Sequence, residues 1–462
     1  MAEVVNGIDW NMALRRWILA SVLMLLAPAA RATPPPPYDL AACLRAALTG
    51  SPDLGAVAAD LGAARAKLAE VKAGRWGTAE YVQLVGLVNE AKGNVLFSPN
   101  DKNDVFQGLG PFTRIDLQIN IPVYTFGKLD AALRAAQEGL EAEQARGASK
   151  RAEVVLNVKH LYYGLLLGRQ LSDVLHDNLA TLDKAITTTK KRLAEGSTAV
   201  TEIDLLKLQA GRARFAKGVI EIDASSPLTR SALARAIGLS SDAGFEIADK
   251  KLRPVDATIE PLDTYLAEGP GRRPEQRALE TGLAAQAAKL EMEQAGYYPN
   301  VFVTTGFRYA WAGNRTEQTN PFVYDPFNFI SPIWILGLQW DLNVFMTTAK
   351  IDGARAELER LEAIRREASS GLQLEIQKVY AAMGQARETV RVAEDGRKAG
   401  RGLLLLTVAN FDLGIGEAEE LFKAIGVYTE ASSDYLRAVY DYNVAVAQLS
   451  KAVGRELTGL EY

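Results

Sequence analysis

The stretch NIPVYTFGKLDAALRAAQ, residues 120–137, changes its hydrophobic periodicity in the middle. Up to that point apolar side chains alternate with polar ones, which is the period of a strand with one apolar and one polar face. The apolar positions of this strand are Ile115, Leu117, Ile119 and Ile121. From Gly127 onward the spacing becomes helical, and one side of the helix carries Leu129, Leu133, Ala136 and Leu140. The sequence therefore predicts a strand that passes into a helix with almost no loop.

The composition of the chain excludes several classes of protein. Its 462 residues are 48% hydrophobic and 23% charged, which excludes a disordered chain. A net charge of −4 argues against nucleic acid as a partner, because phosphate binding needs a clustered basic face. The lone Cys43 excludes an internal disulfide, and the two histidines, His160 and His176, are too few for an ordinary zinc site. We expect both histidines on helix faces, and neither a metal nor a cofactor.

The N-terminus has the order of parts of a secretory signal peptide. Arg15 and Arg16 precede the apolar run WILASVLMLLA, and ARA at residues 30–32 offers small residues at both cleavage positions. Either Met1 or Met12 can be the start. We expect residues 1–32 to be removed, which takes away two acidic and three basic residues and leaves a net charge of −5. The apolar run is too short to span a bilayer, and no later run reaches the roughly 20 residues that a membrane helix needs.

Cys43 has two interpretations. LAAC, residues 40–43, has the form of a lipoprotein cleavage box, in which the cysteine would be acylated. However, TPPPPYD separates it from the apolar run that such a box should adjoin. The alternative is a buried cysteine in a helix with the sequence DLAACLRAAL, and this is the interpretation that the context favours.

The chain contains an internal repeat with a period near 220 residues. KLDAALRA from residue 128 matches KIDGARAE from residue 350, and VKHLYYGL from residue 158 matches IQKVYAAM from residue 376. The segments around Gly196 and Gly414 match at the same offset as the second pair, and ARAIG ending at Gly238 matches SKAVG ending at Gly454. We interpret this as one gene duplication: a first repeat at 33–240, a linker at 241–260 and a second repeat at 261–462.

Each repeat is expected to have the same order of elements. A helix of about 35 residues comes first, Leu40 to Lys72 or Pro261 to Ala295, followed by two strands. A helical run of about 70 residues follows, residues 127–194 or 350–411, and would be on the order of 100 Å long. Its many alanines allow other helices to lie close along it, as in a coiled coil. Gly196 and Gly414 end these runs, and a shorter helix returns to about residue 225 or 454.

The strands have the amphipathic pattern of a membrane barrel. IWILGLQWDL, residues 333–342, places Trp334, Leu336 and Leu338 on one face, with Gly337 and Gln339 on the other. VFVTTGFRYAW, residues 301–311, places Phe307 and Tyr309 on one face, with Thr304 and Arg308 opposite. Thirteen aromatic residues lie between Tyr297 and Phe345, which favours an interfacial girdle. A soluble sandwich strand is the alternative. TAEYVQLVGLV, residues 78–88, alternates poorly and is placed by symmetry. Because four strands cannot close a barrel and open edges cannot sit in lipid, we expect oligomers, and three copies would supply twelve strands.

Taken together, these features resemble the TolC-like outer-membrane efflux channel family over essentially the whole mature chain. The resemblance rests on the signal peptide, DLAACLRAALTGSPDL, a strand ending in Pro-Val-Tyr before Gly-Lys, the distal glycine turns and the duplication. It implies a mainly α fold with membrane β: a trimeric 12-stranded β-barrel, four strands per chain, continuous with a long periplasmic α-helical barrel. The linker at 241–260 would then be equatorial. Pro122 is expected where the strand ladder stops, whereas Asn343 and FMTTAK depart from the family pattern in the second repeat.

The resemblance also implies a function and partners. The chain would be an exit duct in the outer membrane of a Gram-negative cell, serving a tripartite efflux or type I secretion system. Its partners would be two further copies of itself, outer-membrane lipid, a periplasmic adaptor protein and an inner-membrane transporter. Two alternatives remain, a soluble periplasmic coiled-coil scaffold and a stand-alone porin-like pore. No catalytic motif is visible, so we do not expect an enzyme.

The family places a gate of acidic residues just after the second glycine turn, which here reads GIGEAEELFKA, residues 414–424. Glu420 aligns with the first ring carboxylate and Lys423 replaces the second, so an i, i+3 pair between them is expected. Glu417 and Glu419 are further candidates, and Glu202, the equivalent residue of the first repeat, is expected to cross-link the helices there. The alternative is that these glutamates only form a solvated first helical turn, which the helix dipole favours.

The glycine turns themselves resemble the family's docking grooves for the adaptor. Their small residues would admit the tip of another helix, although any helical turn favours glycine. The expected docking residues are Gly196, Ser197, Ala199, Gly414 and Gly416.

Overall fold

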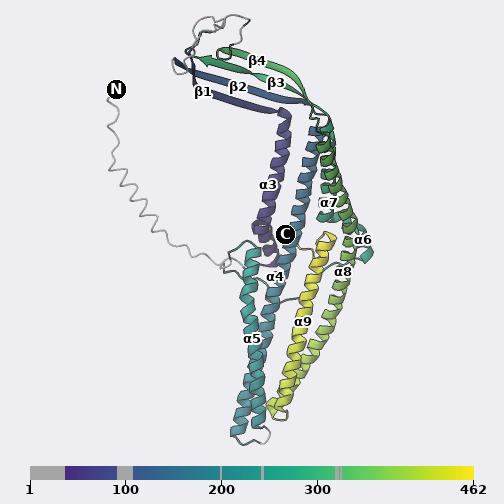
Figure 1. Ribbon diagram of the computed structural model, residues 1–462. Helices are drawn as coiled ribbons and strands as arrows, with labels where there is room; N and C mark the ends of the chain where they lie inside the picture. The colour runs from purple at the N-terminus through teal and green to yellow at the C-terminus, as the bar shows by residue number, and fades with distance from the viewer. Residues whose placement is uncertain are drawn as a thin grey trace, which may run out of the picture.

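The computed structural model describes residues 37–90, 108–197, 200–240, 244–317, 322 and 325–461. Over these residues a four-stranded sheet lies at one end, and long helices run from it to the opposite end (Figure 1). The expected signal peptide lies outside the described residues. None of the described helices combines the length and the apolar character that crossing a membrane requires.

The predicted order of elements is confirmed in both halves of the chain. The first half contains α2 (Leu40–Gly50), α3 (Pro52–Ala73), η1 (Gly74–Trp76), β1 (Thr78–Asn89), β2 (Leu109–Tyr124), α4 (Lys128–Ala194) and α5 (Glu202–Ala236). The second half contains α6 (Leu262–Arg272), α7 (Pro274–Gln294), η2 (Ala295–Tyr297), β3 (Asn300–Ala312), β4 (Phe329–Gln339), α8 (Val344–Leu413) and α9 (Ala418–Val453).

The first helix of each repeat was expected to be continuous, and this prediction is wrong. Each breaks before a proline, Pro52 or Pro274, which takes the first helical position. The preceding residues, Ser51 and Arg273, are extended with ψ 128°. A proline ring disfavours the helical conformation for the residue before it, and its missing N–H costs nothing at a helix start. The two breaks are equivalent in the repeat, because their positions differ by the same offset as Lys128 and Lys350.

The first return helix is longer than expected. Ser225 was predicted to lie near its end, but α5 continues through Pro227 to Ala236. Ser-Ser-Pro favours termination locally. Leu233 and Ala234 are nevertheless buried in the central core, and this packing holds the last turns in a helix.

The sheet is antiparallel in the order β1-β2-β3-β4, and the two faces of its central strands differ in character. Because paired residues share a face, the register aligns large apolar side chains on one side, although Val82, Leu84, Ile333 and Ile335 of the outer strands lie on the other. The apolar face includes Ile115, Leu117, Ile119, Val303, Phe307, Tyr309, Trp334, Leu336 and Leu338. The opposite face includes Arg114, Asp116, Gln118, Asn120, Thr304 and Arg308. β4 ends at Gln339, so Trp340 and Leu342, expected within this strand, lie beyond it.

Large aromatic side chains gather where the sheet meets the helices. Phe345 is 93% exposed and Trp76 is 83% exposed, while Trp340 donates its Nε1–H to the Tyr297 carbonyl at 3.0 Å. An aromatic belt at a membrane–water interface has this arrangement.

The strand-to-helix junction of the first repeat has a loop of three residues, Thr125 to Gly127. Phe126 and Gly127 have φ of 50° and 84°, and two consecutive left-handed residues turn the chain sharply. Phe126 holds this uncommon conformation while its ring stacks on Tyr298, with centroids 5.4 Å apart. Thr125 accepts the Leu129 N–H at 3.2 Å and so caps the new helix.

Pro122 does not end the ladder, contrary to expectation. β2 pairs with β3 as far as Tyr124, with a register shift between Pro122 and Tyr124, so the proline marks a bulge. The second repeat makes its transition differently. Helix α8 begins at Val344, six residues before the position equivalent to Lys128, and Asn343 before it has φ −82°.

The middle of the molecule, which we call the equator, holds the largest cores. α2, α4 and α5 pack around Tyr162, whereas α6, α8 and α9 pack around Ile376 and Val446. Equivalent glycines close both cores. A Cβ on Gly238 would lie 2.3 Å from the carbonyl oxygen of Gly50, and one on Gly454 would lie 2.8 Å from that of Arg272.

Cys43 lies in this core. It is fully buried in α2, and burial raises the pKa of its thiol to about 12. Acylation at this residue would require cleavage before it, which would remove Asp39, the N-cap of α2, and Tyr38, which pairs with Ile247. The structure therefore supports the buried cysteine over the lipoprotein box.

Candidate functional site

The candidate site is the tip, the end of the molecule farthest from the sheet, where α4 turns into α5 and α8 into α9 (Figure 1). Gly196 and Gly414 have φ of 75° and 83°, as expected for the glycines that end long helices. The Ser197 N–H bonds back to the Arg192 carbonyl at 3.0 Å, and the Ile415 N–H bonds to that of Asn410 at 3.1 Å. Both turns are thus closed by their own backbone.

An apolar cluster joins the four helices behind these turns. Phe411 and Leu421 of the second repeat are 1% exposed, and Leu182 and Leu208 of the first repeat are fully buried. The cluster fixes the two hairpins side by side, so polar residues at their ends can interact.

Three contacts cross from the first repeat to the second at the tip. Arg192 of α4 donates to the carbonyls of Phe411 and Asp412 at 2.9 and 3.0 Å, at the C-terminal end of α8, where the helix dipole favours a cation. Lys184 lies 2.7 Å from Asp412, and Lys207 of α5 lies 2.6 Å from Glu419 of α9. In every case the cation belongs to the first repeat.

The tip charges of the two repeats are opposite. Residues 184–217 carry eight basic and three acidic side chains, whereas the equivalent residues 402–435 carry one basic and six acidic ones. This asymmetry was readable in the sequence and points to Lys184, Arg192, Lys207 and Asp412, which our sequence analysis missed. The charge asymmetry alone did not identify these residues, because the sequence does not show that the two hairpins lie side by side.

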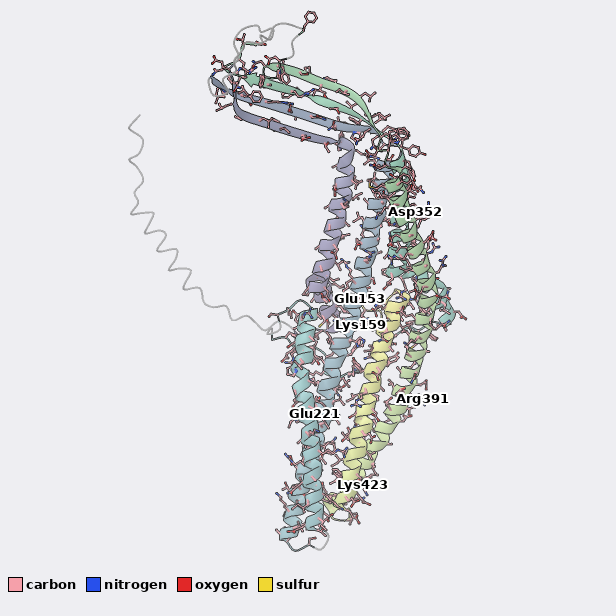
Figure 2. All side chains as sticks on the ribbon, viewed as in Figure 1. Glu153, Lys159, Glu221, Asp352, Arg391 and Lys423 are labelled. Carbon is pink, nitrogen blue, oxygen red and sulfur yellow. The ribbon has the colours of Figure 1, made fainter. Side chains whose placement is uncertain are left out.

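Glu419 is the most strongly connected of the predicted gate residues. Lys207 and Lys423, which lies 2.8 Å away, lower the pKa of its carboxyl to about 2. Figure 2 labels Lys423 beside the turn. The expected i, i+3 pair with Glu420 is therefore wrong: Lys423 pairs with Glu419 at i, i+4, the other spacing that places two side chains on one helix face.

The remaining predicted gate residues have lesser roles in the single chain. Glu420 is exposed, and across the described residues its side chain makes no hydrogen bond or ion pair. Glu417 is the N-cap residue of α9. Glu202 is the exposed first residue of α5, where Thr201 and Asp204 form a capping box, and the expected cross-link is made by Lys207 instead.

The predicted docking residues lie at the two turns. Among the described residues, a Cβ on Gly196 would meet no atom within 4 Å, whereas one on Gly416 would lie 2.9 Å from the backbone nitrogen of Phe411. The second turn is thus closely packed. Ser197 follows Gly196, and Ala199 lies outside the described residues.

The histidines lie on α4, as expected. His160 is 3.2 Å from the hydroxyl of Tyr440, and His176 contacts Ser172 one turn earlier in the helix. Within the described ranges no group of three His, Cys, Asp or Glu side chains is placed to hold a metal ion.

Comparisons with known proteins agree with this architecture. The model of the family described as "Outer membrane efflux protein" matches residues 112–217 and 270–455. Protein CyaE of Bordetella pertussis is 25% identical over 338 residues, 71% of this chain and 66% of that protein. The fusaric acid resistance protein FusA of Burkholderia cepacia is 24% identical over 206 residues, 43% of this chain and 38% of that protein. The chain therefore spans less than two thirds of either relative.

The fold matches a solved outer-membrane protein over nearly its full length. The crystal structure of VceC from Vibrio cholerae has a TM-score of 0.72 at 18% identity, covering 91% of this chain and 97% of that one.

Proposed function

The chain belongs to the outer membrane efflux protein family, and from this premise we propose that it is the exit duct of a tripartite efflux or type I secretion system. The chain is an outer-membrane protein, and it is a channel rather than an enzyme. The duct conducts substrates passively, and its partners supply the energy.

The observation that carries the proposal is that one chain presents two unfinished edges. Within the described residues, β1 and β4 each pair on one side only. Among the helices, α3 buries none of its residues, and α8 contacts α7 above the equator and α9 below it. β1, α3 and α5 therefore form one edge and β4 with α8 the other. Because open strand edges cannot remain in lipid, the first edge of one copy pairs with the second edge of the next.

The helices at these two edges carry stripes of exposed apolar side chains, here called seams, that can pack against the next copy. On α8, Val392, Leu406 and Leu413 are 62%, 70% and 76% exposed and follow a seven-residue spacing that Ala399 completes. On α5, Ile203 and Leu206 are 64% and 63% exposed and begin a similar seam. Such spacing is the coiled-coil pattern, in which two helices bury a common stripe. The interface is heterologous, so repeated rotation closes a ring.

Three copies complete this ring. They supply twelve strands, with the apolar face toward outer-membrane lipid and the polar face toward the lumen. Trp334 and Leu336 on the apolar face are 78% and 72% exposed in one chain, which suits contact with lipid. Below the sheet, the helices of the three copies form a tunnel through the periplasm.

The tip is the gate of this duct. Glu420 points a free carboxylate from each copy toward the axis, and Glu417 contributes at the helix start. Glu419 and Lys423 belong to the contact that keeps the second hairpin against the first. Glu202 lies beside this contact. The turn at Gly196 and Ser197 receives the periplasmic adaptor, and the adaptor links the duct to the inner-membrane transporter. Ala199, Gly414 and Gly416 belong to the same docking region.

The first test is the mass of the mature protein extracted from outer membranes in detergent, followed by conductance in a planar bilayer. A trimer that conducts is the expected result. A water-soluble monomer in the periplasmic fraction would instead support a scaffold. A trimer with steady, fully open conductance without any adaptor would support a stand-alone pore.

A further inference from the structure

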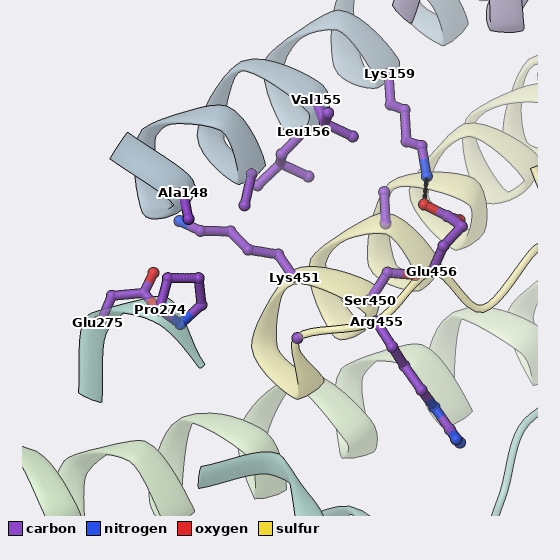
Figure 3. A pocket seen from close by; sticks show the side chains of 13 residues that line it. Ala148, Val155, Leu156, Lys159, Pro274, Glu275, Ser450, Lys451, Arg455 and Glu456 are labelled. Carbon is purple, nitrogen blue, oxygen red and sulfur yellow. Dashed lines mark hydrogen bonds and ion pairs between the residues drawn. The ribbon is translucent and has the colours of Figure 1, made fainter. Parts of the chain in front are cut away.

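The C-terminal end of α9 is tied to α4 by a buried ion pair. Lys159 Nζ lies 2.6 Å from Glu456 Oε2, with side-chain exposures of 2% and 17% (Figure 3). The two residues are 297 positions apart, one in each repeat. A buried pair of this kind resists separation, because each charge without the other would be left in a medium that solvates it poorly.

The segment after α9 is held in both directions. The other carboxylate oxygen of Glu456 accepts the Thr458 hydroxyl at 2.6 Å. Arg455, next in the chain, points away from Glu456 and lies 2.6 Å from Glu260 of the linker (Figure 3). The chain end therefore fastens α9 to α4 on one side and to the linker on the other.

A second tie lies about three turns before the end of α9. Asn443 of α9 is 1% exposed; it donates to the Arg253 carbonyl at 2.8 Å and accepts the Val255 N–H at 2.9 Å. The linker is in turn held by α4, because Gln170 accepts the Leu252 N–H at 2.9 Å. We call the contacts of Lys159, Glu456, Arg455 and Asn443 the equatorial lock.

Below the lock, Asn178 of α4 donates to Thr429 of α9 at 2.7 Å. On the same two helices the hydroxyls of Thr189 and Ser432 are buried with no hydrogen-bond partner in the described part of the chain, and such hydroxyls cost stability. The apolar cluster of the tip holds the far ends of these helices. The contacts of Lys184 and Lys207 at the tip are about half exposed, so each is a weaker tie than a buried pair and adds to the apolar cluster there.

A cavity of ≈ 240 Å³ adjoins the lock, between α4, the start of α7 and the end of α9 (Figure 3). Its walls include Ala148, Ala152 and Ala447, whose small side chains leave space beside the end of α9. On this side the small side chains leave room at the end of α9, whereas its opposite side packs into the core that contains Leu449 and Val453.

We propose that the equatorial lock is a second control point of the gate, with Lys159 and Glu456 as positioning residues that set the tilt of α9. This inference rests on the proposed channel function. α9 has 36 residues and is about 54 Å long, so a tilt of roughly 10° at the lock moves the other end by about 9 Å. Glu417, Glu419 and Glu420 lie at that end, so a small change at the equator displaces the gate.

The test compares Lys159→Met, Glu456→Gln and the exchanged pair Lys159→Glu with Glu456→Lys in the full-length protein. Lys150→Met is the matched control, because Lys150 also lies on α4 but pairs with Glu153 at the surface. Open probability is measured in planar bilayers, and distances between copies are measured with spin labels on Ile415→Cys, which is 77% exposed. Cys43 is fully buried and stays unlabelled.

Both single variants are expected to raise the open probability within the roughly 5- to 150-fold range of coupling between distant sites, and to widen the tip distances. The exchanged pair is expected to restore both values, and Lys150→Met to change neither. If the single variants melt at lower temperature but keep wild-type open probability and tip distances, the lock is only structural and the proposal is overturned.

A tip variant separates this failure from failure of the channel itself. Lys207→Met removes the tip contact directly and is expected to conduct. If it carries no current, the proposed function fails and the lock proposal with it. If it conducts while Lys159→Met and Glu456→Gln remain at wild-type values, only the lock proposal fails.

Discussion

The ammonium group of Lys207 in α5 lies 2.6 Å from a carboxylate oxygen of Glu419 in α9, and this contact joins the two repeats at the tip. Lys423 reaches the other oxygen of the same carboxylate at 2.8 Å. One carboxylate thus holds two cations, and neighbouring Glu420 holds none within the described residues. The two glutamates are therefore expected to respond differently to substitution.

Glu419→Gln is expected to raise the open probability of the channel, because Lys207 loses the charge that keeps the hairpins together. Single-channel recording in planar bilayers measures this change. Glu430→Gln, an exposed glutamate on the same helix, is the control and is expected to have no effect. An unchanged open probability for Glu419→Gln would remove this contact from the gate.

Glu420→Ala is expected to raise the resting conductance, because three shortened side chains widen the constriction on the axis. The closed-state current at fixed voltage measures the effect. If the trace matches that of the wild type, Glu420 does not belong to the gate and is an ordinary residue of a first helical turn.

The Glu419 contact is expected to resist acid. Lys207 and Lys423 lower the pKa of this carboxyl from 4.5 to about 2, so its contribution is complete above pH 4.5 and is lost as the pH falls toward 2. The protection factors of amides at the start of α9, which compare exchange rates with those of an unfolded chain at the same pH, should therefore stay constant from pH 7 to 4.5 and fall only below that. Glu419→Gln removes this dependence, and the same acid response in that variant would assign it to another group.

Arg192→Met is expected to loosen the end of α8. The guanidinium donates to the carbonyls of Phe411 and Asp412 and lies over the Phe411 ring, 5.2 Å from its centroid. Its loss should cost about 1–2 kcal/mol of local stability, measured by hydrogen exchange at residues 410–416. Lys191→Met is the control, since Lys191 is exposed and has only a 3.9 Å contact with Glu195. Equal protection in both variants would contradict this role.

Gly238→Ala is expected to destabilise the protein far more than Gly196→Ala, although both glycines have nearly the same φ, 78° and 75°. The left-handed conformation costs an alanine roughly 1–2 kcal/mol at either site. At Gly238 the new Cβ would also meet backbone, 2.3 Å from the Gly50 oxygen, whereas at Gly196 it would meet no atom of the described residues within 4 Å. Thermal unfolding of the assembled protein measures the difference. Similar melting temperatures for the two variants would show that the backbone around Gly50 and Gly238 can shift to accommodate the added methyl group.

Much of the fold was predictable because it depends on local periodicity. The change from period two to helical spacing after Ile121 predicted the strand-to-helix junction, and Gly196 and Gly414 predicted the tips. The errors arose where local signals were overridden or underweighted. The apolar spacing predicted one continuous helix in each repeat, but a new helix begins at Pro52 and at Pro274. In contrast, α5 continues beyond Pro227, because its last turns pack in the core.

The candidate site was less predictable than the fold. A ring carboxylate could be aligned at Glu420, but Lys207, one of the two partners of Glu419, comes from another helix and another repeat. The tip charges of the two repeats differ in sign along the sequence, yet this becomes a contact only when the hairpins are known to lie side by side. Lys159 and Glu456 gave no signal, because each is an ordinary charged residue on a helix or at its end.

The sequence by itself predicted the internal repeat, the alternation of strands with long helices, and the glycines that end the long helices at the tip. These follow from near-neighbour preferences along one chain. Only the tertiary structure decided which charges meet: Lys207 with Glu419 at the tip, and Lys159 with Glu456 at the equator. The reason is physical, since an ion pair depends on distance in space, and segments hundreds of residues apart come within 3 Å only after the helices have packed.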